Sequence, residues 1–308
     1  MRLFHSDKGI TRIQVGVAIA LALVLSFIVA FLLRHEDATW LHSAFERSVK
    51  KLQIIQAISR DLLASAEAEK SAVMADTDEA SQAFAEQSTQ AAHHVEKARR
   101  ELEHLLGGSR QEAHLFREFS QCWEKLQEID REVLSLAVQN TNLKALRLSF
   151  VPAAEAMRRM EKALNHLMDL LSSSPNALGI TRRASQAVIG ALNIYTLQAP
   201  HIAESTAARM DEMEADMTRL DAQVTEALQS LQALVDEPGT PFLDAARASY
   251  QDFQKLNAEI VELSRQNNDI RSFALSLGQK RKTTAQCQDV LAALQEMVRQ
   301  SMSYKATR

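Results

Sequence analysis

The sequence has 308 residues, of which 46% are hydrophobic, 24% charged and 5% aromatic. A chain of this length and composition can bury a sizeable core, which excludes disorder as the default. Eight glycines and five prolines are too few for the closely spaced turns of a β-sandwich or barrel, so long helices are expected. A formal net charge of −4 argues against nucleic acid as a partner, because binding phosphates requires a surplus of Lys and Arg.

Near the N-terminus, residues 13–33 form a long apolar stretch. These 21 residues carry no charge, and at ~1.5 Å per residue a helix of this length spans a hydrocarbon layer of ~30 Å. A cleavable signal peptide would have a shorter apolar stretch and a small-residue cleavage site, whereas Arg34 follows directly here. We therefore predict a transmembrane helix over residues 13–33.

Charges around this segment predict its orientation. Residues 1–12 contain Arg2, Lys8 and Arg12 against Asp7, and an excess of positive charge keeps a short flanking segment in the cytoplasm. We expect a single-pass protein of a bacterial inner membrane, with a cytoplasmic tail over residues 1–12 and the bulk of the chain in the periplasm.

An internal repeat follows the predicted span. Between Phe119 and Phe150, apolar residues recur in a heptad pattern, and the segment 127 residues later repeats it, with Asn140 and Asn267 at equivalent a positions. The preceding helix repeats at an offset of 129, where residues 81–105 match residues 210–234. The two offsets differ by two residues. This difference arises between the two repeated helices, where the turn-forming segments are residues 106–109 in one copy and residues 235–239 in the other, as expected for true repeats.

Turn signals divide the remaining chain into eight predicted helices. We place these helices at residues 34–75, 78–106, 110–148, 151–171, 178–203, 206–235, 241–276 and 279–303. The predicted fold is all-α: one transmembrane helix followed by two tandem antiparallel four-helix bundles, over residues 34–172 and 177–303. The alternative fuses successive helices into four long rods, but the heptad phase slips by one residue near Asp76 and again near Pro152.

Three features of the first module suggest a known family. They are the predicted hairpin at residues 75–79, the helix that contains Trp123, and Pro152 at the start of the next helix. With these features the module resembles the four-helix-bundle sensor domain of methyl-accepting chemotaxis receptors and related histidine kinases, and the second module resembles it more loosely. The resemblance implies a role in signal transduction or chemotaxis.

In that family, the bundle lies between two membrane helices and precedes a cytoplasmic signalling region. This chain departs from the pattern, because residues 172–176 are polar where the second span is expected and the C-terminal residues are polar as well. We therefore expect any signal to pass through a membrane partner protein.

Five residues are candidates for ligand binding. Asn140 and Asn267 occupy a positions, where a polar side chain more often fixes helix register than contacts a ligand. Arg147, at the next a position, could reach an anionic ligand, although snorkelling at a helix end is the simpler interpretation. Trp123 and Tyr250 occupy equivalent e positions, where an aromatic side chain usually flanks a helix interface and less often forms a stacking platform for a ligand.

We expect neither catalysis nor a cofactor. A di-iron bundle needs paired Glu-x-x-His motifs, and one such motif occurs, Glu101 with His104. The two cysteines, Cys122 and Cys287, are 165 residues apart, which suggests neither a disulfide framework nor a thiolate metal site. No Gly-rich phosphate loop, haem attachment motif or nucleophile elbow is present.

Two classes of function remain. The first is a membrane-anchored, extracytoplasmic sensor that binds a small molecule and reports through a partner. The second is a structural or adaptor protein whose helical faces dock other chains without a small ligand. In either case, we expect a homodimer.

Overall fold

The computed structural model describes residue 26 and residues 43–107 and 109–306. A helix over residues 43–73 comes first, and the elements after it are α2 (Asp78–Leu105), α3 (Arg110–Ala137), α4 (Thr141–Leu148), η1 (Ser149–Ala153), α5 (Ala154–Leu170), α6 (Ala177–Ala203), α7 (Ala207–Gln232), α8 (Thr240–Gln266), α9 (Asn268–Leu275), η2 (Ser276–Lys280) and α10 (Arg281–Ala306). Every regular element in the described ranges is helical, which confirms the all-α prediction.

The predicted transmembrane helix, residues 13–33, lies outside the described residues apart from Ser26. Within the ranges that are described, no helix is both long enough and apolar enough to cross a membrane.

Two compact units make up the described chain. The first contains the described parts of Met1–Leu62 and of Gln286–Arg308, together with His93–Cys122. The second contains Leu63–Ala92 and Trp123–Ala285. Each unit thus draws on both predicted modules, so the helices are grouped differently from the predicted bundles over residues 34–172 and 177–303.

In the first unit, contacts join helices from the beginning and the end of the chain. Lys51 Nζ, on the helix over residues 43–73, donates a hydrogen bond of 2.6 Å to Glu112 Oε2 on α3, and both side chains are buried. A disulfide between Cys122 and Cys287 links α3 to α10. The C-terminal helix of the second copy therefore packs with helices of the first copy.

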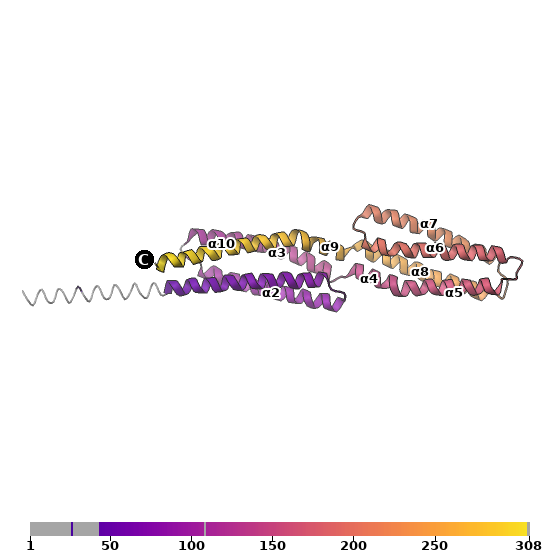
Figure 1. Cartoon of the computed structure of the whole chain (residues 1–308), viewed down its shortest axis with the longest axis horizontal. Helices are drawn as coiled ribbons and strands as arrows, with labels where there is room; N and C mark the ends of the chain where they lie inside the picture. Colours follow the sequence, from indigo (N-terminus) through magenta and orange to yellow (C-terminus); the bar gives the residue numbers. More distant parts are fainter. Residues whose placement is uncertain (1–25, 27–42, 108, 307–308) are drawn as a thin grey trace, which may run out of the picture. The chain divides into compact units, whose positions relative to one another are not determined.

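The second unit contains a four-helix arrangement of α5, α6, α7 and α8 (Figure 1). Helix α6 packs along α7 and α5 along α8, while further contacts join α5 to α6 and α7 to α8. Gly190 allows the close approach of α6 and α7, because a Cβ atom at this position would lie 2.6 Å from Val224 Cγ2. Leu164, Ala187, Leu231 and Phe253 are among the buried residues of this core.

The two copies of the repeat therefore exchange their fourth helices. Helix α5 belongs to the first copy but packs on α6 and α8 of the second, and α10 of the second copy is bonded to α3 of the first. The fourth helices are exchanged because the chain forms no hairpin between α3 and α4, so α5 does not fold back onto α3. Residues 138–140 separate α3 from α4, and Asn140 among them is left-handed, while Asn267 alone separates α8 from α9; backbone hydrogen bonds continue on both sides of each asparagine.

The breaks in the long helices fall at the two equivalent asparagines. Asn140 has φ 49° and Asn267 has φ 55°, the left-handed region that asparagine tolerates better than most residues. The predicted helices over residues 110–148 and 241–276 run through these positions, so their boundaries are wrong. The heptad phase also ends at Asn140, since Arg147 and Phe150 beyond it are exposed.

Where the sequence predicts breaks, near Pro152 and Gly278, the helix instead continues through a π-helical segment. Segments η1 and η2 each contain five residues and lie at equivalent positions of the two copies. A π-turn holds one residue more than an α-turn, which accounts for the one-residue slip of the heptad phase near Pro152. The lack of an N–H group on Pro152 is tolerated there because the local hydrogen bonding is already irregular.

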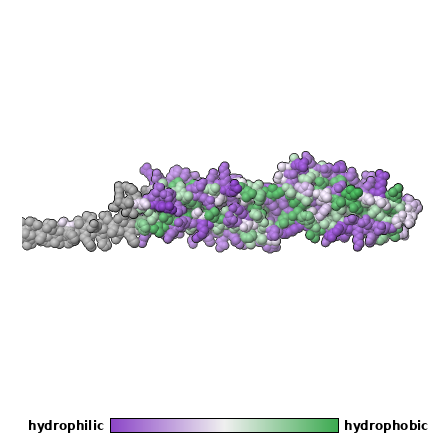
Figure 2. Space-filling model, viewed as in Figure 1, coloured by the Kyte–Doolittle hydropathy of each residue, from purple (hydrophilic) through white to green (hydrophobic). Residues whose placement is uncertain are grey.

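Hydrophilic residues cover much of the visible face of the described chain, with apolar patches between them (Figure 2). Helix α6 contributes exposed apolar side chains at Leu178, Ile189 and Leu192. Their spacing of 11 and 3 residues places these three side chains on one side of the helix.

Candidate functional site

The predicted aromatic candidates are buried and do not line an open site. Trp123 is 1% exposed and Tyr250 is 2% exposed. The hydroxyl of Tyr250 donates a hydrogen bond of 2.6 Å to Asp221 Oδ1 on α7. Burial, helped by the neighbouring Asp221 carboxylate, raises the pKa of Tyr250, so the hydroxyl remains a donor at neutral pH. Tyr250 therefore supports a residue of the site that is described below.

Arg147 binds the turn that precedes α2, and Asn140 binds the first residue of α2. Arg147 donates a hydrogen bond of 2.6 Å to the backbone oxygen of Asp76, and Asn140 Nδ2 donates one of 2.8 Å to Asp78 Oδ1. Lys144 lies 3.6 Å from the same carboxylate. These contacts give both candidates a structural role.

Asn267 belongs to a buried junction between equivalent segments of the two copies. Asn142 Nδ2 donates to Asn267 Oδ1 at 2.9 Å. Two further bonds join residues 127 positions apart: Asn268 N donates to Thr141 Oγ1 at 3.1 Å, and Asp269 N to Asn142 Oδ1 at 3.3 Å. The segment after Asn140 therefore binds the equivalent segment after Asn267. The repeat in the sequence does not predict that equivalent segments contact each other.

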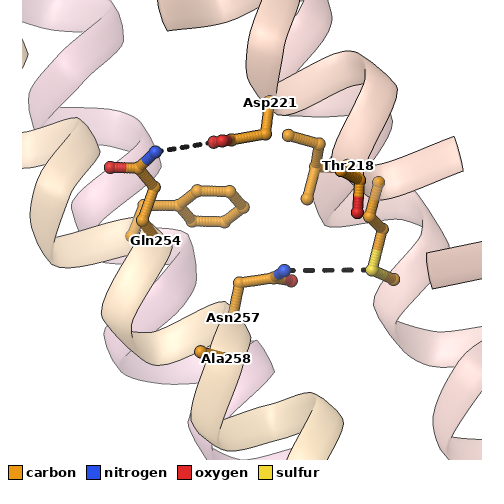
Figure 3. A pocket seen from close by; sticks show the side chains of 8 residues that line it. Thr218, Asp221, Gln254, Asn257 and Ala258 are labelled. Carbon is orange, nitrogen blue, oxygen red and sulfur yellow. Dashed lines mark hydrogen bonds between the residues drawn. The ribbon is translucent and has the colours of Figure 1, made fainter. Parts of the chain in front are cut away.

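A surface hollow lies between α6, α7 and α8 (Figure 3). Its volume is about 230 Å³, and its lining residues are Ile194, Met217, Thr218, Asp221, Phe253, Gln254, Asn257 and Ala258. This volume is below the ~300 Å³ at the lower end of drug-sized pockets. The hollow is thus suited to a small metabolite.

The polar side chains of the hollow come from two helices that face each other. Figure 3 shows Asp221 and Thr218 on one helix opposite Gln254 and Asn257 on another. Gln254 Nε2 donates a hydrogen bond of 2.7 Å to Asp221 Oδ1, the oxygen that also accepts from Tyr250. Asn257 Nδ2 lies 3.8 Å from Met217 Sδ, within range of a weak hydrogen bond to sulfur.

Behind the hollow, Asn257 connects to a buried polar network. Its Oδ1 accepts a hydrogen bond of 2.8 Å from Gln198 Nε2 on α6. Gln198, which is fully buried, in turn accepts one of 2.7 Å from Ser149 Oγ. Ser149 is the first residue of the π-helical segment η1. Two hydrogen bonds, through Gln198, therefore connect Asn257 in the wall of the hollow to the irregular turn of the fourth helix.

A second polar cluster contains the C-terminal part of α6. The fully buried His201 lies 2.8 Å from Ser264 Oγ through Nδ1 and 2.9 Å from Glu214 Oε1 through Nε2. Arg265 donates to Glu214 at 2.5 Å and also pairs with Asp211. The hydrogen bond from Arg265, together with that of His201, lowers the pKa of Glu214.

The disulfide between Cys122 and Cys287 corrects the interpretation of the cysteines. Their Cα atoms are 5.6 Å apart, although 165 residues separate them in the sequence. Spacing alone gives no sign of the pair, because it forms only when α10 packs in the same unit as α3.

The residues of the hollow were also missed. Comparing the copies could have pointed to them, because the counterpart of Asp221 at the 129-residue offset is Ala92, and that of Asn257 at the 127-residue offset is Asp130. Among the described residues no group of three or more His, Cys, Asp or Glu side chains is placed to hold a metal ion.

Comparison with known proteins identifies the class. Residues 13–178 match a family model described as a four helix bundle sensory module for signal transduction. This match covers more than half of the chain, and the chain belongs to this family. No curated protein matches it.

Proposed function

We propose that this sensory module binds a small molecule in the hollow between α7 and α8 and passes the signal to a membrane partner. In this proposal, a helix over residues 13–33 anchors the chain in a bacterial inner membrane, residues 1–12 lie in the cytoplasm, and the remainder lies in the periplasm. The chain acts as a homodimer.

The observation that carries the proposal is the double position of Asn257. A ligand in the hollow would contact its side chain, and the same side chain binds Gln198, the partner of Ser149 in η1. A change in this hydrogen bonding alters the environment of a π-turn, and such turns are frequent at functional sites. The network thus offers a contiguous route from the hollow to the fourth helix.

The disulfide supports the periplasmic location. Disulfides form and persist in oxidising compartments, including the bacterial periplasm, and are rare in the cytosol. The predicted positive-inside orientation places Cys122 and Cys287 on the oxidising side. Protease treatment of intact spheroplasts tests this topology: the large domain should be digested, and its survival would overturn the orientation.

A thermal-shift screen of the full chain in lipid nanodiscs against small metabolites tests ligand binding. A ligand at 100 times its dissociation constant adds ~2.7 kcal/mol to the free energy of unfolding. The shift should saturate and should weaken in Gln254→Ala. The matched control is Gln127→Ala, the counterpart in the first copy and similarly half-buried, which should leave the shift unchanged.

The alternative function is an adaptor that docks other chains without a ligand. The exposed apolar side chains of α6, Leu178, Ile189 and Leu192, favour it. The absence of any saturable shift in the screen, combined with specific crosslinks from α6 to another membrane protein, would support the adaptor over the sensor.

A further inference from the structure

The hollow has an unbalanced charge. Of its eight lining residues, Asp221 alone carries an ionisable side chain. An aspartate is negatively charged at neutral pH, and no Lys, Arg or His lines the hollow to neutralise it. A charged ligand must therefore present a positive group to this wall.

Asp221 is held in place with one oxygen available. Both of its hydrogen bonds, from Tyr250 at 2.6 Å and from Gln254 at 2.7 Å, go to Oδ1. No side chain or backbone group among the described residues bonds to Oδ2. Since donors on two sides fix the carboxylate, it can accept a further charge-assisted hydrogen bond without losing side-chain freedom.

The remaining walls suit the body of an organic cation. Phe253 and Met217, which are 1% and 4% exposed, give the hollow an apolar lining that suits the aliphatic part of a ligand. Thr218 and Asn257 add neutral polar groups. The volume of about 230 Å³ limits the ligand to a small molecule.

We propose that the hollow selects a small organic amine without a carboxylate, whose ammonium group pairs with Oδ2 of Asp221. A zwitterion or an organic acid would place its carboxylate among walls that offer no cation. This inference rests on the proposed sensor function and specifies the ligand class of the same site.

Four compounds with the same carbon skeleton test the ligand class: putrescine, γ-aminobutyrate, succinate and butanediol. Isothermal titration calorimetry on the full chain in nanodiscs should give saturable binding of putrescine, weaker binding of γ-aminobutyrate, and no binding of succinate or butanediol. Binding of succinate, or binding of none of the four, would overturn the amine assignment. The metabolite screen tests the proposed sensor function separately, so failure of the amine assignment does not contradict that function.

Substitutions of carboxylates on α7 locate the binding. Asp221→Asn keeps the shape of the side chain and removes its charge, so putrescine should bind at least about tenfold more weakly. Asp216→Asn is the control, because Asp216 is exposed and pairs with Arg219 away from the hollow. Circular dichroism on both variants checks that they remain folded. Equal putrescine affinity in Asp221→Asn and the wild type would sink the proposal.

Discussion

The two copies of the repeat bury polar side chains at equivalent positions, but with different charge. In the second copy the pair is the buried Gln198 and the half-buried Asn257, which are joined by a hydrogen bond of 2.8 Å. Offsets of 129 and 127 residues place Glu69 and Asp130 at these positions in the first copy. One helical framework thus accepts either two amides or two carboxylates.

A lysine accompanies the carboxylates. Lys280 lies 2.9 Å from Glu69 Oε2 and also pairs with Asp130. Its counterpart at the 127-residue offset is Ala153. All three charged side chains are at most 10% exposed. The exchanged fourth helix supplies the cation, so the first copy's carboxylates depend on a residue from the other copy.

The amide pair and the charged cluster differ in how many of their buried polar atoms have a hydrogen-bond partner. In the amide network, Gln198 both donates to Asn257 and accepts from Ser149. In the charged cluster, two carboxylates face one ammonium, and Glu69 Oε1 has no hydrogen-bond partner among the described residues. Buried charges of this kind contribute little net stability, yet their removal one at a time is costly. The comparison indicates that the charged cluster is the more sensitive of the two.

Lys280→Ala should have the largest effect. The substitution leaves Glu69 and Asp130 buried without a cation, which should lower the free energy of unfolding by about 3–5 kcal/mol. Denaturant unfolding followed by circular dichroism measures the loss. The control is Lys282→Ala, since Lys282 is exposed.

A triple variant sharpens this test. Glu69→Gln, Asp130→Asn and Lys280→Ala together install the residue types of the amide site, which has Gln198, Asn257 and Ala153 at the equivalent positions. Because replacing a whole buried ionic cluster is often neutral or stabilising, the triple variant should recover most of the stability that Lys280→Ala loses. A triple variant as unstable as the single one would show that the two sites are not interchangeable.

The disulfide is the second difference between the copies. Cys122 and Cys287 correspond to Ser249 and Met160, so the second copy has no equivalent bond. Replacing both cysteines with serine should lower the free energy of unfolding by about 2–4 kcal/mol. A reducing agent should lower the melting temperature of the wild type and leave that of the double variant unchanged. Equal sensitivity of both proteins would contradict the bond.

The left-handed asparagines are a feature that the copies share. Asn140→Ala and Asn267→Ala should each cost about 1–2 kcal/mol, because alanine is strained at positive φ. Glycine at the same positions removes the side-chain hydrogen bonds but adopts positive φ without strain. The glycine variants therefore separate the contribution of the side-chain bonds from that of backbone strain. Denaturant unfolding of the four variants should rank each glycine variant above its alanine partner; the reverse order would argue against backbone strain.

The smallest expected effect is a difference in pH dependence. Burial raises the pKa of Asp130, while Lys280 acts in the opposite direction. A carboxyl whose pKa is raised in the folded state stabilises the fold below the unfolded pKa of ~3.9, and this contribution is lost as the pH rises through the folded pKa. The stability of the wild type relative to Asp130→Asn should therefore fall as the pH increases from about 4 towards neutral.

Glu214 provides a comparison of opposite sign. Its pKa is lowered by Arg265 and His201, so its contribution is present above the unfolded pKa and is lost as the pH falls through the folded one. The stability of the wild type relative to Glu214→Gln should rise with pH over the acidic range. Unfolding free energies measured across that range should give slopes of opposite sign for the two comparisons with wild type. Slopes of the same sign would contradict one of the two assignments, and the sign would show which.

Much of the local structure could be predicted from the sequence. The all-α class and the turns near residues 76, 107, 175, 205 and 237 follow from apolar periodicity and from the residues that break helices. The 127-residue offset reappears in the left-handed asparagines and in the two π-helical segments. Such features depend on residues close together in the chain, and a repeated sequence repeats them.

The site could not be predicted in the same way. Asp221, Gln254 and Asn257 become neighbours only when α7 packs on α8, whereas the predicted candidates Trp123 and Tyr250 are buried in the structure. Proline and glycine indicated helix ends at residues 152 and 278, but a π-turn absorbs both positions. Local propensity therefore misplaced the breaks that decide which helices meet.

The sequence by itself determined that this protein is helical, that it is duplicated, and where most of its turns lie, because each of these properties is encoded within a few helical turns. Tertiary structure alone decided that α5 and α10 exchange partners, that Lys280 meets Glu69 and Asp130, and that the two cysteines pair. These contacts join residues far apart in the chain. These contacts form because the chain does not reverse direction at Asn140 or at Asn267. The heptad pattern does not predict whether a chain reverses direction at such a residue.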